Sequence, residues 1–570
     1  MKSLWYNLNR LFAEPKFHYW YILLVFMLPN LGMFYTESTG LLTRVVAVIL
    51  PLGVYMCLLT LANRVGKVFW WVFPLVIVIA WQFFLLFLFG ESPIAVDMFL
   101  NLATTNVTEV NELLGNMLSI MALVVLLYGG AIALSVVSLR CERVMGHSFK
   151  RTMRLAGTAV IFLGVWLLAI NYVVDKRFKL QDDVFPVNGV YNLGIAVDRY
   201  VDGVRRVDDW RTFDAHAVSA RSDTVPEVYI FVIGETSRAA NYAILGYERP
   251  TTPRLSALGD SIVVFDNAVT MSNTTHKSVP LLLSGVASEG NMDSLYTQSG
   301  LIKAFASTGF QTAYYSNQRR NHSFIDRLGS EAAEVKFLKD SLLLAGVYDE
   351  ELLRLVDDRL SRYDGGKLLI VLHAYGSHFK YNDRYPHEHA VFLPDEAISA
   401  EAQFRDVLIN AYDNTIAYTD FLVGSLVERL DSLHVPSVLV FTSDHGEDIF
   451  DDSRGRFLHA SPLPTYWHLH VPLVVWASQP YREQWGDKWS ALVSNARRPV
   501  STNMVMYHTL LDMAGISTVL TRDSLSLAGD SYCEPARLYV TDHNEFVPLD
   551  RAGLKQVDID CFTARGMEVK

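Results

Sequence analysis

The sequence predicts two structural parts: a membrane domain of five apolar helices, and an α/β domain with a mainly parallel central sheet. The chain has 570 residues, of which 51% are hydrophobic, and the apolar residues gather before residue 175. From residue 226 onward, short β-branched or aromatic runs alternate with helical patterns. Residues 176–225, between these parts, have a mixed composition. We therefore expect a transmembrane domain at 1–175, a connector at 176–225 and a soluble domain at 226–570.

Five apolar runs are each long enough to cross a bilayer, which takes roughly 20 residues. They cover residues 17–36, 45–63, 68–90, 117–139 and 155–174. Basic residues precede the first run and lie between runs two and three and between runs four and five, while the loop 91–116 has no Lys or Arg. By the positive-inside rule, the N-terminus is cytoplasmic and the large C-terminal domain lies outside the cytoplasm.

The loop 91–116 contains Glu109 and Glu112. One interpretation is an amphipathic segment at the membrane interface with solvated glutamates. The other is that one of these glutamates faces the catalytic domain and contacts the substrate.

The connector predicts an amphipathic helix, because apolar residues recur at helical spacing between charged ones. These residues are Val190, Leu193, Val197, Tyr200, Val201 and Val204. Such a stripe lies on a membrane surface or packs against protein, and the second outcome is the more common.

Charge and cysteine content exclude some functions. The net charge of −11 argues against a nucleic-acid partner, which usually requires a basic patch. There are four cysteines and no C-x-x-C spacing, and only Cys533 and Cys561 are placed to form a disulfide in an oxidising compartment.

The soluble domain should contain strands at 228–233, 261–265, 311–315, 367–373, 436–442, 471–476 and 537–541. Helices should lie between them, notably at 295–308, 350–362, 400–432 and 502–515. This alternation favours a parallel sheet with helices on both faces.

Four groups of metal-capable residues interrupt or follow these strands. They are Glu235, the segment 271–280, the run His373 to His378, and the run 441–448 with His459 beyond it. The carboxyl ends of parallel strands meet at one edge of a sheet, so the four groups should converge there. Taken singly, each group has an ordinary interpretation, such as a helix cap or a loop histidine. Together, carboxylates, imidazoles and a hydroxyl suit a zinc site.

These residues also resemble a known family. The soluble domain is similar to the alkaline phosphatase/sulfatase superfamily, and with five spans in front the whole chain looks like a phosphoethanolamine transferase of the lipid A-modifying type. The matching motifs are G-E-T-S-R at 234–238, G-Y-E-R-P-T-T-P at 246–253, T-H-K-S-V-P at 275–280, H-A-Y-G-S-H at 373–378 and T-S-D-H-G-E at 442–447.

The resemblance implies roles for individual residues. Thr275 would be the nucleophile, and zinc would be held by Glu235, Asp444 and His445 together with the Thr275 oxygen. His378, His459 and His373 would lie near a second metal or the donor phosphate. Asn317 matches a residue near the phosphate, and Glu109 matches a membrane-loop glutamate that contacts the donor head group.

The implied reaction has two steps. Phosphatidylethanolamine, a membrane lipid, gives its head group to Thr275, and an envelope acceptor such as lipid A or the LPS core takes phosphoethanolamine from the phosphothreonine. This places the protein in the bacterial inner membrane, with its catalytic domain in the periplasm, and links it to polymyxin resistance.

The sequence departs from the lipid A enzymes in two places. No cysteine lies in 266–290 or 311–330, and the segment 315–322 has no clear counterpart of a lysine near the phosphate, although Arg319, Arg320 or His322 would supply a cation. The acceptor therefore remains open, with a periplasmic glucan among the alternatives.

Five other functions are alternatives. A phosphoglycerol transferase or a phosphodiesterase would use the same site. A sulfatase needs a Cys or Ser in a C/S-x-P-x-R context, which is absent near Thr275. A binding module without metal is disfavoured by the intact ligand set, and a transporter by the near absence of ionisable residues in the spans.

Overall fold

The computed structural model describes residues 12–37, 39–89, 94–104, 118–176, 178–206, 208–222, 224–321, 323–340 and 347–569. Internal contacts divide the chain into two compact units. The first comprises residues 1–102 and 114–199, and the second comprises 103–113 and 200–570.

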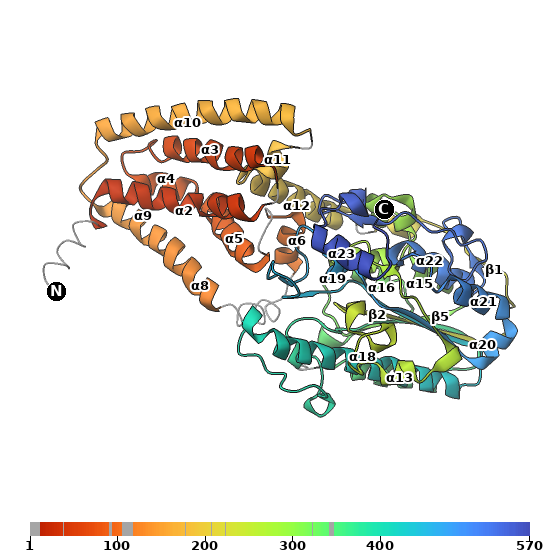
Figure 1. Cartoon of the computed structure of the whole chain (residues 1–570). Coiled ribbons are helices and arrows are strands. Elements are labelled where there is room, and N and C mark those ends of the chain that lie inside the picture. The colour runs from red at the N-terminus through yellow and green to blue at the C-terminus, as the bar shows by residue number, and fades with distance from the viewer. Residues whose placement is uncertain are drawn as a thin grey trace. The chain divides into compact units, whose positions relative to one another are not determined.

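The first unit is helical (Figure 1). Its helices are α2 (Pro15–Thr36), α3 (Leu41–Leu58), α4 (Val65–Trp71), α5 (Phe73–Phe89), α6 (Val96–Thr104, which runs into the second unit), α8 (Leu118–Val124), α9 (Gly130–Arg140), α10 (His147–Val174), α11 (Leu180–Asp183) and α12 (Val187–Arg205, which also crosses the boundary). A π-helical turn at Val125–Gly129 joins α8 to α9.

Four helices of the described residues are long and apolar enough to cross a membrane: Pro15–Thr36, Leu41–Leu58, Ile120–Arg140 and His147–Val174. They confirm four of the five predicted spans. The remaining run, predicted at 68–90, is broken into α4 and α5, which meet at an angle of 80° and make a fifth candidate if the pair counts as one span.

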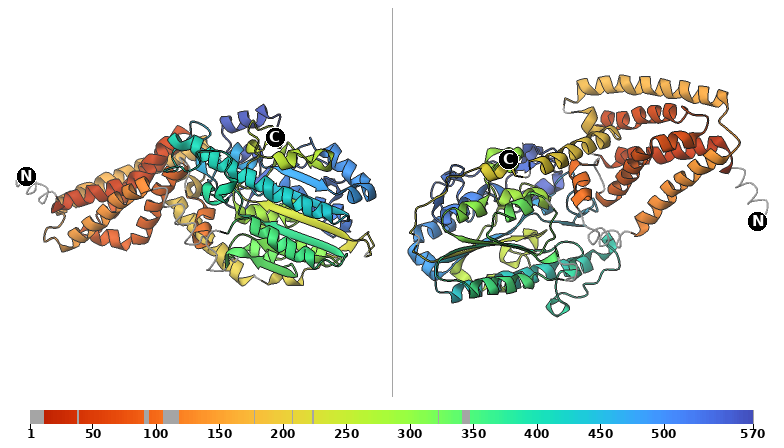
Figure 2. Two further views of the ribbon diagram at one scale, coloured as in Figure 1. Left: turned by 90° about the horizontal axis from the view of Figure 1, so that it is seen from below. Right: turned by 180° about the vertical axis from the view of Figure 1, so that it is seen from behind.

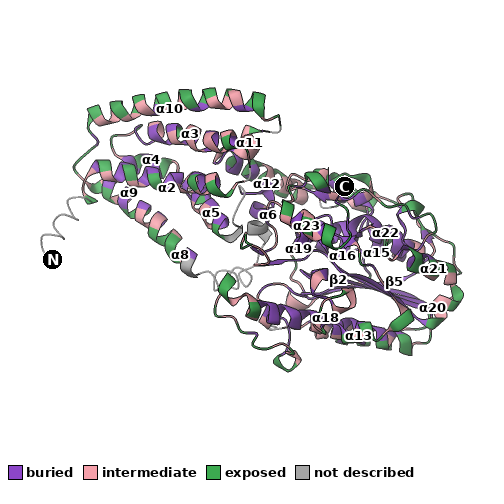
Figure 3. Cartoon of the chain, in the orientation of Figure 1, coloured by how far each residue is buried: buried purple, intermediate pink, exposed green. Residues whose placement is uncertain are grey.

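Helices α3 and α10 pack closely through small residues. A Cβ atom at Gly53 would lie 2.8 Å from Ile161 of α10, and one at Gly157 would lie 2.7 Å from Cys57 Sγ of α3. Close backbone approach of this kind is how helices associate without a hydrophobic driving force in lipid. The rest of α10 is mostly exposed or half-buried (Figure 3).

Helix α12 forms where the connector pattern predicts it, but its packed face is the small and polar one. Asn188, Gly189, Asn192 and Ala196 are buried. The apolar stripe is exposed, with Val190 57% and Val197 55% accessible. The face of α12 that packs among the described residues is therefore not the apolar stripe, because glycine and alanine allow a closer helix contact than the larger apolar residues. Packing of the stripe against the soluble domain stays a prediction, as does its position on a membrane surface.

The second unit is built on a seven-stranded sheet in the order β3-β11-β8-β2-β7-β5-β6. The strands are β2 (Glu227–Gly234), β3 (Ile262–Val264), β5 (Gln311–Ser316), β6 (Glu334–Phe337), β7 (Lys367–His373), β8 (Ser437–Ser443) and β11 (Leu473–Ala477). Strands β8, β2, β7, β5 and β6 run parallel, and β11 is antiparallel to both of its neighbours. The mainly parallel sheet is confirmed.

Helices cover both faces of this sheet, which Figures 1 and 2 show from three sides. On one face lie α13 (Pro253–Ser256) and α18 (Arg405–Ser432), and on the other lie α15 (Leu301–Ala306), α16 (Phe324–Gly329) and α22 (Thr502–Met513). The remaining helices are α14 (Thr275–Leu282), α17 (Glu350–Ser361), α19 (Tyr466–Leu469), α20 (Gln479–Gln484), α21 (Gly486–Asn495) and α23 (Gln556–Ala564). Each residue of β2, β7 and β8 is buried, as expected for strands covered on both faces.

Short strands form two-stranded sheets beside the main one. The pairs are β1 (Val218–Ser219) with β13 (Ile516–Ser517), β4 (Ala268–Val269) with β12 (Val500–Ser501), β9 (Asp448–Ile449) with β10 (Phe457–Leu458), and β14 (Leu538–Val540) with β15 (Phe546–Pro548). The strand predicted at 537–541 is thus present as β14, outside the main sheet.

The helix predicted at 295–308 is wrong in extent. The structure has a 3₁₀ turn at Met292–Tyr296 and a separate helix α15 that starts at Leu301. Gly300 has an extended backbone, and its N–H donates to the buried Glu331 carboxylate at 2.8 Å. This bond replaces a helical one, so the helix begins only after it.

Candidate metal and nucleophile site

A strained turn after β2 positions the first carboxylate of the site. Thr236 has a positive φ of 61°, which is rare for a β-branched residue and marks a constrained position. Its N–H donates to Asp444 Oδ1 at 3.1 Å, and its hydroxyl donates to Glu235 Oε1 at 2.8 Å. The turn therefore ties Glu235 at the end of β2 to Asp444 at the end of β8.

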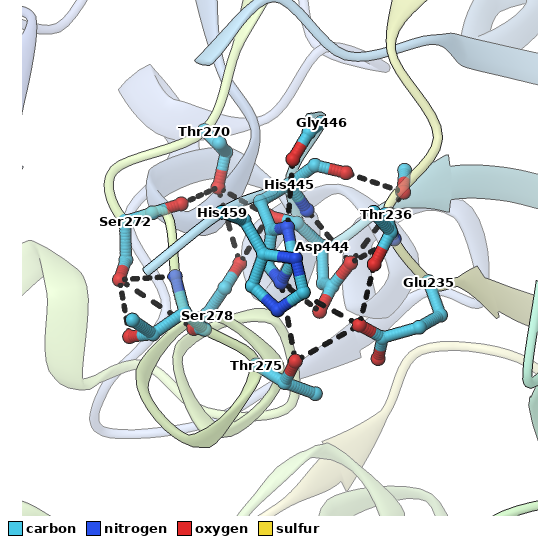
Figure 4. Close-up of polar contacts among 12 residues, drawn as sticks. Glu235, Thr236, Thr270, Ser272, Thr275, Ser278, Asp444, His445, Gly446 and His459 are labelled. Atoms are coloured by element: carbon cyan, nitrogen blue, oxygen red, sulfur yellow. Dashed lines mark hydrogen bonds and ion pairs between the residues drawn. The ribbon is translucent and has the colours of Figure 1, made fainter. Parts of the chain in front are cut away.

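Thr275 is the first residue of α14, at the edge of the sheet where these strands end. Its hydroxyl donates to Glu235 Oε1 at 3.0 Å and lies 3.1 Å from His445 Nε2 (Figure 4). Thr275 is half-buried, whereas Thr236 is fully buried. The N-terminus of α14 also carries partial positive charge, which favours an anion beside Thr275.

The backbone around His445 determines its tautomer. His445 Nδ1 lies 3.0 Å from the carbonyl oxygen of Gly446, which only accepts hydrogen bonds. The proton is therefore on Nδ1, and Nε2 presents its lone pair toward Thr275 and Glu235. Burial lowers the pKa of His445 to about 3, so this ring is neutral at pH 7.

Glu235, Asp444 and His445 form a group whose ligand atoms all lie within 4.8 Å of one another. Burial raises the pKa of both carboxyls to about 7, and the Glu235 charge further raises that of Asp444. Asp444 Oδ2 is buried and has no hydrogen-bond partner among the described residues. Two carboxylates, one imidazole lone pair and a hydroxyl are a donor set that fits a divalent cation, with zinc favoured over oxygen-preferring metals.

A second group shares Glu235 and adds His378 and His459, again within 4.8 Å. His378 Nδ1 lies 2.7 Å from the Phe379 carbonyl oxygen, which leaves its Nε2 lone pair available. His459 Nδ1 lies 3.2 Å from Glu447 Oε1, and its ring centroid is 4.4 Å from that of His445. Burial lowers the pKa of both histidines, that of His459 to about 3.

The loop that carries His459 is strained on both sides. Leu458 and Ala460 have positive φ values of 69° and 62°. Positive φ values on both sides of His459 indicate that strained backbone holds this histidine in its orientation toward the site.

The other predicted residues lie at different distances from this centre. His373, the last residue of β7, is buried with its Nε2 3.8 Å from Glu235 Oε2, and burial lowers its pKa to about 4. Asn317 is buried, and its amide donates to the Asp349 carboxylate at 2.8 Å. Its neighbour Gln318 lies nearer the group, with Nε2 3.5 Å from Glu235 Oε2. Glu109 lies outside the described residues.

Sequence reasoning missed two positioning carboxylates. Asp349 accepts from the N–H groups of Tyr375 and Gly376, each at 2.8 Å, as well as from Asn317. Glu447 orients His459. Glu447 is the last residue of the motif S-D-H-G-E, so the sequence could have indicated it. Asp349 precedes helix α17 and belongs to no motif, so a single sequence gives no signal for it.

A family model completes this picture. The model described as Sulfatase matches residues 227–516, just over half of the chain. The chain belongs to the sulfatase family. The match starts with β2 and includes every site residue from Glu235 to His459, which confirms the resemblance to the alkaline phosphatase/sulfatase superfamily. The matched residues also include Thr275 within T-H-K-S-V-P.

Phosphoethanolamine transferase EptA of Helicobacter pylori is 29% identical to this sulfatase-family chain over 312 residues, 52% of the chain and 56% of EptA. The chain thus spans about half the length of the curated relatives it matches.

Two solved structures are similar in fold. The C-terminal periplasmic domain of EptC from Escherichia coli, in complex with Zn, is 25% identical with a TM-score of 0.53, and the match covers 60% of this chain and 96% of that one. The integral membrane protein lipooligosaccharide phosphoethanolamine transferase A (EptA) from Neisseria meningitidis has a TM-score of 0.71 at 22% identity, with 89% and 97% covered. A helical membrane part with an alkaline-phosphatase-like domain is therefore confirmed as the fold.

Proposed function

We propose that this chain transfers phosphoethanolamine from phosphatidylethanolamine to an envelope acceptor, through a phosphothreonine at Thr275. The observation that carries the proposal is the Thr275 hydroxyl, half-buried and held by Glu235 and His445 at the start of α14. The similarity to proteins named phosphoethanolamine transferase EptA supports the transferred group.

The chain's residues suit both steps of this reaction. In the first step, Thr275 Oγ bonds to phosphorus, the bond from phosphorus to the glycerol oxygen breaks, and diacylglycerol leaves. Thr275 loses one proton and diacylglycerol gains one, so the step is proton-neutral. In the second step, an acceptor oxygen bonds to phosphorus, the Oγ–P bond breaks, and the threonine proton is restored. His378 and His459, both neutral, line the half-buried side of the site where phosphate oxygens would lie.

We infer that Glu235, Asp444 and His445 hold zinc together with the Thr275 oxygen. When bound, the metal lowers the pKa of the hydroxyl and stabilises charge on the phosphoryl group. The two carboxyls whose pKa burial raises to about 7 support this inference, because a nearby cation is what allows both to ionise. The zinc complex of a 25% identical structure supports the choice of metal.

The membrane helices fit a lipid donor, which a tethered enzyme meets in its own bilayer. We propose that residues 1–175 anchor the protein in the bacterial inner membrane, that 176–225 connect the two parts, and that 226–570 form the catalytic domain in the periplasm. Lipid A or the LPS core is the proposed acceptor, on the basis of the resemblance to lipid A-modifying enzymes.

Mass spectrometry of envelope lipids tests this function. Expression of the full-length chain should add phosphoethanolamine to lipid A or LPS core, and Thr275→Ala should abolish the addition, while Thr297→Ala, an exposed threonine outside the site, should not. Addition of phosphoglycerol, modification of a periplasmic glucan alone, or simple release of head groups would each contradict the proposal and identify the alternative.

A further inference from the structure

Tyr375, Lys339 and Arg384 form a cationic platform beside His378. Tyr375, on the loop after β7, is buried with 6% of its surface accessible, and its ring stacks on His378 with centroids 5.2 Å apart. The Arg384 guanidinium lies 4.4 Å from the centre of the same ring, and the Lys339 ammonium also lies over it. One aromatic ring therefore gathers two cations next to a residue of the metal and nucleophile site.

Hydrogen bonds fix this platform relative to Glu235. The N–H of Tyr375 and of Gly376 donate to Asp349, and the N–H of Ser377 donates to the Glu235 carbonyl at 2.9 Å. Gly376 has a φ of 51°, and a Cβ atom there would lie 2.6 Å from the Glu235 carbonyl oxygen. The loop therefore packs directly on the backbone of Glu235, and Tyr375 has little freedom to move away from the site.

Lys339 and Arg384 come from different parts of the chain. Lys339 follows β6, at the edge of the sheet where the parallel strands end, and is half-buried. Arg384 is 7% accessible and donates from Nε to the Lys380 carbonyl at 3.0 Å. The acidic residues next to each in the chain, Asp340 and Asp383, form ion pairs with Arg320 and Lys380. Burial lowers the pKa of His378, and the charges of both cations add to this effect.

We propose that Lys339 and Arg384, held on the ring of Tyr375, bind an anionic phosphate of the substrate beside His378. This subsite rests on the proposed function, which brings phosphate groups to Thr275. Two cations suit a phosphate because guanidinium and ammonium groups form charge-assisted hydrogen bonds with its oxygens, and a preformed aromatic support reduces the entropy lost on binding. The segment 315–322 has no clear counterpart of the lysine that the lipid A enzymes place near the phosphate. In this proposal, Lys339 and Arg384 supply the positive charge instead.

The phosphate has two possible sources, the diester of the donor and the monoester of a lipid A acceptor. Two assays on the full-length protein in detergent separate them. The first measures the rate at which phosphatidylethanolamine loads Thr275 without acceptor. The second measures how fast the loaded protein transfers its group to lipid A, compared with lipid A from which the phosphates have been removed.

Lys339→Gln and Arg384→Gln should each raise the KM for the phosphate-bearing substrate about tenfold and leave kcat within about twofold, since one charge-assisted hydrogen bond is lost. A higher KM in loading assigns the subsite to the donor. A higher KM in transfer, seen with lipid A and not with its dephosphorylated form, assigns it to the acceptor. Arg384→Lys, which keeps the charge, should restore part of the affinity, and it also covers the case in which Arg384→Gln fails to fold.

Matched controls are available on the same domain. Lys336 lies over the ring of Tyr315 and pairs with Glu334, and Arg498 lies over the ring of Tyr532 and pairs with Glu534. Lys336→Gln and Arg498→Gln should leave both KM values unchanged. Unchanged KM values in folded Lys339→Gln and Arg384→Gln proteins, for both substrates, would overturn the subsite. If Arg384→Gln does not fold, unchanged KM values in Lys339→Gln alone would do so. Failure of the wild-type protein to load Thr275 would instead overturn the proposed function.

Discussion

The two ends of strand β2 carry buried glutamates in opposite electrostatic settings. At the start of the strand, Glu227 Oε2 lies 2.5 Å from Arg221 Nη1, and Oε1 lies 3.9 Å from Lys367 Nζ. At its end, Glu235 shares its surroundings with Asp444, and its ion-pair contacts are to His373 and His445, whose rings burial keeps neutral. Both side chains are at most 1% accessible.

We propose that this difference separates a structural carboxylate, Glu227, from a functional one, Glu235. A buried charge is stable when the fold supplies an opposite charge, as it does at Glu227. At Glu235 the described part of the chain supplies a second carboxylate and neutral imidazoles, and the bound cation of the proposed function would balance their charge. Both glutamates are equally buried, and only their charged partners distinguish them.

The substitution with the largest expected effect is Glu235→Gln, and the effect is on the rate of transfer. We expect transfer to fall by on the order of 10²–10³-fold, because an electrostatic contact at the reacting oxygen is lost. Bound zinc, measured by elemental mass spectrometry of the purified protein, should fall in parallel. In the presence of a chelator, the free energy of unfolding should stay level or rise, since one of two repelling carboxylates is removed. A variant that keeps its zinc and its activity would remove the distinction between the two ends of β2.

The opposite pattern is expected for Glu227→Gln. Loss of this charge leaves Arg221 and Lys367 without their buried counter-charge, and breaking such a pair costs about 3–5 kcal/mol. Urea unfolding of the full-length protein in detergent should show this loss, while activity per folded molecule and zinc content stay at the wild-type level. If activity and metal were lost with stability unchanged, Glu227 would have to be part of the site.

A third buried carboxylate gives an intermediate case with a smaller effect. Glu331 accepts from the N–H groups of Gly300 and Lys303 and lies 3.5 Å from Arg327. Burial raises its pKa from 4.5 to about 7, so the folded state keeps a proton that the unfolded state has lost between these values. Stability should therefore fall as pH rises through this window, by at most about 1.4 kcal/mol per pH unit.

Urea midpoints of the wild-type protein and Glu331→Gln across that window check this slope. The variant should show a flatter dependence on pH, because glutamine does not titrate. Equal slopes for the two proteins would mean that Arg327 balances Glu331 as fully as Arg221 and Lys367 balance Glu227.

Much of the fold follows from strand patterns, because β2, β7 and β8 are buried on both faces and read as continuous apolar runs. Strand β6 was missed, since E-V-K-F is a half-buried edge strand with alternating charge. The metal-capable residues were predictable because parallel strands deliver their ends to one edge. Lys339 and Arg384 were not, because they lie 45 positions apart and meet only through the ring of Tyr375.

Residue spacing alone also does not show which threonine is the proposed nucleophile. Thr236 and Thr275 both donate to Glu235 Oε1, at 2.8 Å and 3.0 Å. What separates them in the structure is accessibility, since Thr236 is sealed inside a strained turn and Thr275 is half-buried. The motif T-H-K-S-V-P points to Thr275, and its accessibility supports the proposal that Thr275 is the nucleophile.

Peptide mass spectrometry of the loaded protein tests the central claim most directly. The full-length, zinc-containing protein is incubated with phosphatidylethanolamine without acceptor, quenched in acid and digested. The account predicts one phosphoethanolamine group on Thr275, which disappears when acceptor is added. A group on Thr236, or an unmodified Thr275 in protein that still consumes the lipid, would contradict it.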